Sequence, residues 1–122
     1  MRRMLCRSRI HRATVTDADL NYEGSITIDP VLLDAAGIHE YEQVQVANIN
    51  TGARFETFAM RGKRHSGQVV VSGAAARVAA PGDIVMIFCY SSYDEDELDG
   101  FRPLHVNVDE TNQIRDDSRR TA

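Results

Sequence analysis

Several features of other protein classes are scarce in this sequence of 122 residues. It has no tryptophan and only two cysteines, and its longest apolar run extends from Ile84 to Tyr90. Because a membrane-spanning helix needs roughly 20 apolar residues, we expect no membrane segment. The N-terminus, MRRMLCRSRI, is charged but has no uninterrupted apolar stretch, which argues against a secretory signal. We therefore expect one domain, located in the cytoplasm.

Patterns of metal-binding residues are also absent. Cys6 and Cys89 lie far apart, and neither belongs to a CxxC pair. The four histidines, at positions 11, 39, 65 and 105, lack the short spacings of a zinc site. We expect two buried free thiols and no metal ion.

The charges are unevenly distributed around a net value of -4. The first 12 residues carry five arginines and no acid, whereas Asp94–Asp99 is an acidic run. An acidic protein with only a short basic segment is a poor candidate for nucleic-acid binding. We interpret the acidic run as a solvated loop.

Short β-strands dominate the pattern. Alternating or β-branched segments predict strands at about 10–16, 25–29, 44–48, 54–60, 69–71 and 84–90. The turn Asn50-Thr51-Gly52 joins two of them into a hairpin. One short helix is predicted after Asp29 as its cap, with Pro30 in its first turn and Gly37 at its end.

This pattern indicates a mainly β fold, a small β-barrel with one or two short helices. A barrel of this size buries little surface per residue, so oligomerisation is a plausible source of further stability. The chain becomes polar and acidic after residue 90, and residues 110–122 are predicted to form a flexible tail.

A specific resemblance begins at Tyr22-Glu23-Gly24-Ser25. Further blocks are IHRA at 10–13, VT at 15–16, ADL at 18–20, LDAAGI at 33–38, NTGARFET at 50–57, GAAA at 73–76 and GDIV at 82–85. Together, in this order and over about residues 1–90, they make the chain similar to the bacterial aspartate 1-decarboxylases. The resemblance implies a double-psi β-barrel, a homotetramer and a cofactor made from the chain itself, without metal or pyridoxal phosphate.

The cofactor implied by the resemblance is a pyruvoyl group derived from Ser25. The Ser25 hydroxyl would attack the Gly24 carbonyl and convert the peptide bond to an ester. Glycine leaves that carbonyl sterically open and permits unusual backbone angles. Elimination to dehydroalanine and hydrolysis would then turn this zymogen into chains 1–24 and 25–122, the latter beginning with pyruvoyl.

The resemblance also assigns roles to other residues. The Thr57 hydroxyl would stabilise the oxyanion formed during cleavage, with support from Tyr22 and Ser72. The pyruvoyl ketone would form a Schiff base with the substrate amine and accept the electrons left by CO2. Arg54 would grip a substrate carboxylate through two parallel hydrogen bonds. Other residues implied at the substrate site are Arg9, His11, Thr57, Gly73, Ala74 and Ala75.

Three positions depart from the family pattern. Arg9 stands where the family usually has lysine, Ser72 where it has asparagine and Phe58 where it has tyrosine. Phe58 lacks the hydroxyl that the family is thought to use as proton donor after decarboxylation. Whether cleavage is spontaneous or needs a maturation factor is left open by the sequence.

The leading hypothesis is a lyase that converts L-aspartate to β-alanine for pantothenate synthesis. One alternative is a paralogue acting on another amino acid such as glutamate, because Arg9 and Phe58 could reshape the pocket. Another is a catalytically inactive barrel that serves as a binding subunit. The three departures motivate both alternatives.

Overall fold

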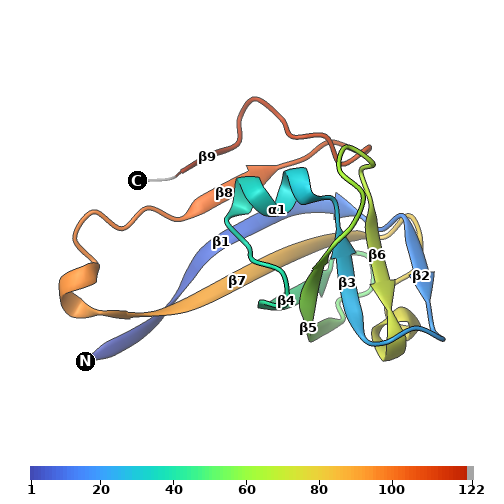
Figure 1. Cartoon of the computed structure of the whole chain (residues 1–122), viewed down its shortest axis with the longest axis horizontal. Coiled ribbons are helices and arrows are strands. Elements are labelled where there is room, and N and C mark those ends of the chain that lie inside the picture. Colours follow the sequence, from blue (N-terminus) through green and yellow to red (C-terminus); the bar gives the residue numbers. More distant parts are fainter. Residues whose placement is uncertain (121–122) are drawn as a thin grey trace.

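The structure, a computed structural model, describes residues 1–120 and is mainly β (Figure 1). The strands are β1 (Arg2–Thr14), β2 (Asp17–Asp19), β3 (Ser25–Ile28), β4 (Gln43–Asn48), β5 (Arg54–Arg61), β6 (Val69–Ser72), β7 (Ile84–Asp94), β8 (Leu104–Asn107) and β9 (Arg119–Arg120). Within this part of the chain there is one α-helix, α1 (Pro30–Ala36), and two 3-10 helices, η1 (Gly73–Arg77) and η2 (Glu95–Glu97).

The strands form a mixed sheet in the order β2-β6-β3-β5-β4-β7-β1-β8-β9. Antiparallel pairing joins β1 to β7, β4 to both β5 and β7, and β3 to β6. Parallel pairing joins β3 to β5, β2 to β6 and β1 to β8. The two end strands, β2 and β9, are not paired with each other, so the sheet of the described residues is not closed. The mainly β prediction is confirmed, and the arrangement is consistent with a small β-barrel.

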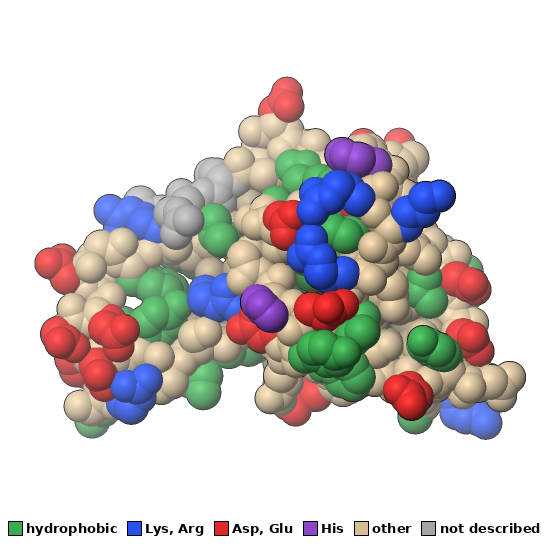
Figure 2. Space-filling view, in the orientation of Figure 1, with side chains coloured by type: hydrophobic (Ala, Val, Ile, Leu, Met, Phe, Trp, Pro, Cys, Tyr) green, Lys and Arg blue, Asp and Glu red, His purple; other side chains and the backbone are tan. Residues whose placement is uncertain are grey.

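The two longest strands extend beyond their predicted bounds. β1 begins at Arg2 rather than near residue 10, and β7 continues to Asp94 rather than ending near residue 90. Ion pairs of 2.8 Å between Arg2 and Asp94, and between Arg3 and Glu95, join their exposed ends. Figure 2 shows acidic side chains gathered at the end of the molecule where Figure 1 places η2. The acidic run is therefore partly paired rather than a simple solvated loop.

Helix α1 confirms its predicted capping signals. The backbone N–H of Val31 donates to Asp29 Oδ1 at 2.9 Å, and Gly37 ends the helix with a left-handed φ of 65°. The Asp29 carboxylate also accepts from the backbone N–H groups of His65 and Gly67, at 3.1 and 2.9 Å. This buried side chain thus ties the segment after β3 to the loop before β6.

The core is formed by the inward side chains of the strands and of α1. Fully buried members include Ile10, Ile26, Leu33, Val46, Val71 and Ile87. The predicted alternation is clear in β4, where Val44 and Val46 are buried and Gln43 is exposed. The hairpin of β4 and β5 is also confirmed, with Val46 opposite Phe55.

The C-terminal segment is more ordered than predicted. β8 pairs with β1, and an isolated bridge joins Val108 to Ile114. Asn112 is 2% exposed, and its amide donates to the carbonyls of Thr14 and Gly67 at 2.8 Å each. Residues 110–118 are mostly exposed but are anchored through Asn112 and the bridge at Ile114, while 121–122 lie outside the described residues.

Both cysteines are free, as predicted. Cys89 is buried, and burial raises the pKa of its thiol to about 11 despite the guanidinium of Arg7 at 2.9 Å. Cys6 is only half-buried. Among residues 1–120, no helix has both the length and the apolar character needed to cross a membrane.

Candidate active site

The Gly24–Ser25 bond joins an exposed loop to a buried strand. Ser25 opens β3 and is 3% exposed, whereas Gly24 is exposed. Directly opposite Ser25 on β6 lies Ser72, which is 2% exposed. The predicted nucleophile is therefore the first residue of a paired strand, and the bond it would attack lies at the N-terminal end of β3.

Gly73, the residue after Ser72, approaches this bond closely. Its φ is +77°, a conformation that side chains rarely adopt, and an added Cβ would lie 2.6 Å from Gly24 Cα and 2.9 Å from its nitrogen. The same Cβ would lie 3.3 Å from the carbonyl oxygen of Tyr22. Only glycine fits here, so the structure brings Gly73 and the Tyr22 backbone to the predicted cleavage site.

Gly24 itself has a different environment. An added Cβ would meet no atom within 4 Å, and its φ is not in the positive range found at Gly73. The expected unusual backbone angle is therefore not present in the uncleaved chain. What the structure does provide is open space where a side chain on Gly24 would lie, one residue before Ser25.

Thr57 and Phe58 lie on β5, which flanks β3 on the side opposite β6. β3 and β5 are parallel, with Ile26 beside Ala59. Thr57 and Phe58 come just before Ala59, as Gly24 and Ser25 come just before Ile26, so both pairs of residues lie at the same end of the two strands. We use the name cleavage edge for the residues gathered here: Tyr22, Gly24, Ser25, Thr57, Phe58, Ser72 and Gly73. Ala74 and Ala75 follow in η1.

Sequence reasoning missed Tyr41, whose ring stacks on that of Phe58 with 6.1 Å between centroids. Tyr41 is 69% exposed, and its backbone N–H donates to the Ala59 carbonyl at 2.7 Å. No motif marks Tyr41 in the sequence, because its partner is distant along the chain and is brought to it by the fold. It adds a phenol ring beside Phe58, which lacks a hydroxyl.

Arg54 lies at the beginning of β5, four positions before Phe58. At about 3.3 Å per residue, this is roughly 13 Å along the strand. Its guanidinium lies 5.7 Å from the centre of the Phe88 ring and donates to Gln45 Oε1 at 3.3 Å. In a single chain, Arg54 is therefore directed toward β4 and β7 and away from Ser25.

Arg9 lies on β1, paired with Phe88 of β7. Its Nη2 atom lies 3.2 Å from Nδ1 of His105 on β8. We use the name arginine face for Arg9, Phe88 and Arg54. The two arginines flank Phe88. Arg9 contacts His105 on β8, whereas Arg54 contacts Gln45 on β4. A pair of cations on one face suits a ligand that carries carboxylates.

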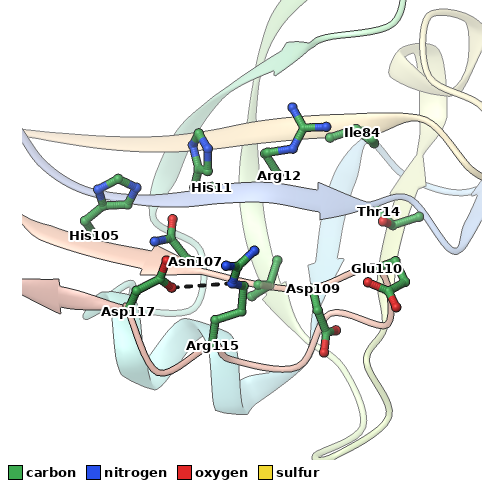
Figure 3. Close-up of a pocket in the computed structure, with 11 residues that line it drawn as sticks. His11, Arg12, Thr14, Ile84, His105, Asn107, Asp109, Glu110, Arg115 and Asp117 are labelled. Atoms are coloured by element: carbon green, nitrogen blue, oxygen red, sulfur yellow. Dashed lines mark ion pairs between the residues drawn. The ribbon is translucent and has the colours of Figure 1, made fainter.

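His11 is separated from the cleavage edge in the sheet order, since β5, β4 and β7 lie between β3 and β1. It lines a cavity of about 500 Å³ between β1, β8 and the C-terminal segment (Figure 3). Burial lowers the pKa of its imidazole, and the nearby Arg9 and Arg12 lower it further. Within residues 1–120, its buried Nδ1 has no hydrogen-bond partner. Ser25 does not line this cavity.

The predicted site residues thus fall into separate groups. The cleavage edge contains the hydroxyls of Tyr22, Ser25, Thr57 and Ser72 and the close backbone approach of Gly73, but none of its residues is charged. The cations predicted to bind substrate lie on β1 and at the far end of β5. One chain therefore gathers the residues predicted for cleavage, but not the predicted substrate-binding cations, near Ser25.

Comparisons with known proteins agree on one family. The family model for aspartate decarboxylase matches residues 1–115. A protein of Heliobacterium modesticaldum named aspartate 1-decarboxylase is 51% identical over 120 residues, covering 98% of this chain and 91% of the relative. Proteins of the same name from Methylobacillus flagellatus and Thermoanaerobacter pseudethanolicus are each 50% identical, covering 94% and 93% of this chain and 91% and 97% of the relatives.

Proposed function

The chain belongs to the aspartate decarboxylase family, and we propose from this that it is a lyase with a self-made pyruvoyl group. Its reaction is the decarboxylation of L-aspartate to β-alanine and CO2, the activity named for its relatives. The observation that carries the proposed cofactor is the contact of Gly73 with Gly24, beside a buried Ser25.

Cleavage begins with the Ser25 hydroxyl. Its oxygen attacks the Gly24 carbonyl carbon, so that a C–O bond replaces the C–N bond and the Ser25 nitrogen becomes a free amine. Thr57 lies two residues before Ala59 on the neighbouring strand β5, whose Ala59 pairs with Ile26, and in this proposal its hydroxyl donates to the oxyanion of this step. Loss of the Cα proton of residue 25 then expels chain 1–24 as a carboxylate and leaves dehydroalanine. Water hydrolyses the imine tautomer of dehydroalanine, so that the nitrogen leaves as ammonia and the water oxygen becomes the ketone oxygen.

The residues present fit a pyruvoyl group at position 25. The Gly73 backbone approaches so closely that a Cβ there would collide with Gly24, while the side-chain position of Gly24 itself is open. When formed, the group supplies a ketone that takes the substrate amine and withdraws the electrons left by CO2. Ser72 and the backbone of Gly73, Ala74 and Ala75 would line it.

Substrate binding requires the arginine face, and this supports the predicted homotetramer. Arg54 grips a carboxylate through its guanidinium fork, and Arg9 is a second candidate. Because neither lies beside Ser25 in its own chain, we propose that a second copy supplies its arginine face to each cleavage edge. A complete site would then form only between subunits.

A proton must reach the substrate carbon after CO2 leaves, and Phe58 cannot donate one. We propose the Tyr41 hydroxyl as the donor, because its ring stacks on Phe58. The glutamate paralogue and the inactive barrel are not favoured, since the relatives carry the aspartate name. We further propose a cytoplasmic enzyme of pantothenate synthesis, which the two free thiols support.

Intact mass spectrometry tests the proposed cofactor. The purified protein should show two chains instead of one of 13.6 kDa, with the larger one lighter by one ammonia than simple hydrolysis gives. Ser25→Ala should remain intact, because no nucleophile is left. A wild-type chain that stays whole after prolonged incubation, also with cell extract that contains any maturation factor, contradicts the proposal.

A further inference from the structure

His105 holds Arg9 through a directional hydrogen bond. Parallel pairing of β1 and β8 places Arg9 directly beside His105, and Arg9 Nη2 lies 3.2 Å from His105 Nδ1. A guanidinium can only donate hydrogen bonds, so Nδ1 must be the acceptor. This contact requires a neutral imidazole with its proton on Nε2.

The His105 ring is fixed by its surroundings. The pairing of β8 with β1 continues over four residues, from Leu104 to Asn107. The ring meets that of His11 edge to face, with 5.3 Å between centroids and 75° between planes. Figure 3 shows both rings side by side on these neighbouring strands. An acceptor anchored in this way can orient a long, flexible arginine.

We propose that His105 is a positioning residue for substrate binding: it orients the Arg9 guanidinium toward a substrate carboxylate. The inference rests on the proposed function, in which Arg9 binds that carboxylate. Arginine carries five N–H donors, and the bond to His105 occupies one of them. A lysine is a point charge that binds from many directions, whereas the planar fork of arginine must face the carboxylate correctly. The arginine at position 9 therefore benefits from an anchor.

Matched substitutions at position 105 test this role. The Oδ1 atom of His105→Asn occupies nearly the position of Nδ1 and can accept from Arg9, whereas His105→Leu offers no acceptor. We expect His105→Leu to raise the KM for aspartate about tenfold with kcat within a factor of two, and His105→Asn to stay near wild type. Size-exclusion and mass measurements should show both variants assembled and cleaved.

A double variant separates positioning from a general structural role. In an Arg9→Ala background, His105→Leu should add nothing further to KM, because the group it positions is gone. In the wild type, a histidine-selective ¹H–¹⁵N spectrum should show His105 neutral with its proton on Nε2, and Arg9→Ala should shift the Nδ1 resonance.

Several results would overturn the inference: an unchanged KM in His105→Leu, equal effects of leucine and asparagine, or an effect that persists without Arg9. A protonated His105 in the spectrum would do so as well. Failure of the proposed function looks different, because the wild-type protein would then not decarboxylate aspartate. If the enzyme is active but substitution of His105 does not change its KM for aspartate, only the positioning role is rejected.

Discussion

The cleavage edge and the arginine face are built in opposite ways. The cleavage edge is uncharged and depends on backbone: Ser25 and Ser72 are buried opposite each other, and Gly73 touches Gly24 through main-chain atoms. The arginine face depends on long side chains, with Arg54 lying over Phe88 and Arg9 held by His105.

This difference separates two tasks. Making a cofactor from a peptide bond requires fixed backbone geometry, because the nucleophile and carbonyl must meet at one angle. Binding an amino acid requires charge, which flexible side chains can deliver from a neighbouring subunit. We therefore expect substitutions at the cleavage edge to affect cleavage and those on the arginine face to affect substrate binding.

The largest effect is expected for Gly73→Ala. The new Cβ would lie 2.6 Å from Gly24 Cα and would displace the bond by a sizeable fraction of an ångström. Such a misplacement can cost about 100-fold in rate, so cleavage followed by mass spectrometry should slow by at least that factor. Gly82→Ala is the matched control, because Gly82 has φ +92° but open space around an added Cβ. Equal cleavage rates in the two variants would remove Gly73 from the cleavage edge.

Arg54→Ala tests the other region. It should leave cleavage and assembly unchanged but raise the KM for aspartate. The loss of binding free energy should be roughly 2–5 kcal/mol if the substrate carboxylate stays buried without a partner. Arg64→Ala is a suitable control, since Arg64 is an exposed arginine paired with Asp34 at 2.7 Å on α1. Normal steady-state kinetics in Arg54→Ala would exclude this residue from substrate binding.

Phe58→Tyr tests the source of the proton in decarboxylation, at a position that belongs to the cleavage edge. The added hydroxyl should raise aspartate turnover at least tenfold with little change in cleavage, since a placed general acid typically contributes a factor of about 10² to 10⁴. Tyr41→Phe should lower turnover, and the double variant should recover it, because position 58 then supplies the proton. If neither single variant changes kcat, the donor is another group.

The smallest effect concerns Asp29, which anchors the end of β3 away from the cleavage edge. Burial raises the pKa of this carboxyl, but hydrogen bonds from Gly67, Val31 and His65 outweigh that effect and lower the pKa overall. The charged form therefore adds stability above the ordinary pKa of about 3.9, and this contribution is lost as the pH falls through the lowered value.

We expect Asp29→Asn to cost about 1–2 kcal/mol of unfolding free energy at pH 7. The difference from wild type should shrink in urea titrations as the pH falls below the ordinary pKa of an aspartate and through the lowered pKa of Asp29. Cleavage should be nearly unchanged, because the hydrogen bonds of Asp29 lie beyond the other end of β3. A difference that is constant with pH would show that the charge of Asp29 does not contribute.

Local signals in the sequence determined several elements of secondary structure and the family of this protein. The capping of α1 by Asp29 and Gly37, the β4–β5 hairpin and the central strands depend on neighbouring residues, so their patterns can be recognised directly. The motif around Gly24-Ser25, with its companion blocks, identified the family. These features depend on short-range chemistry or on order along the chain.

Tertiary structure decided how these parts are arranged. Tertiary contacts bring Gly73 to Gly24, Tyr41 to Phe58 and His105 to Arg9, across sequence separations that no local pattern encodes. They also anchor the polar C-terminal segment, because the buried amide of Asn112 satisfies backbone groups of β1 and the loop before β6. Strand pairing separates the cleavage edge from the arginine face, since adjacent strands lie about 4.8 Å apart and three strands stand between β3 and β1.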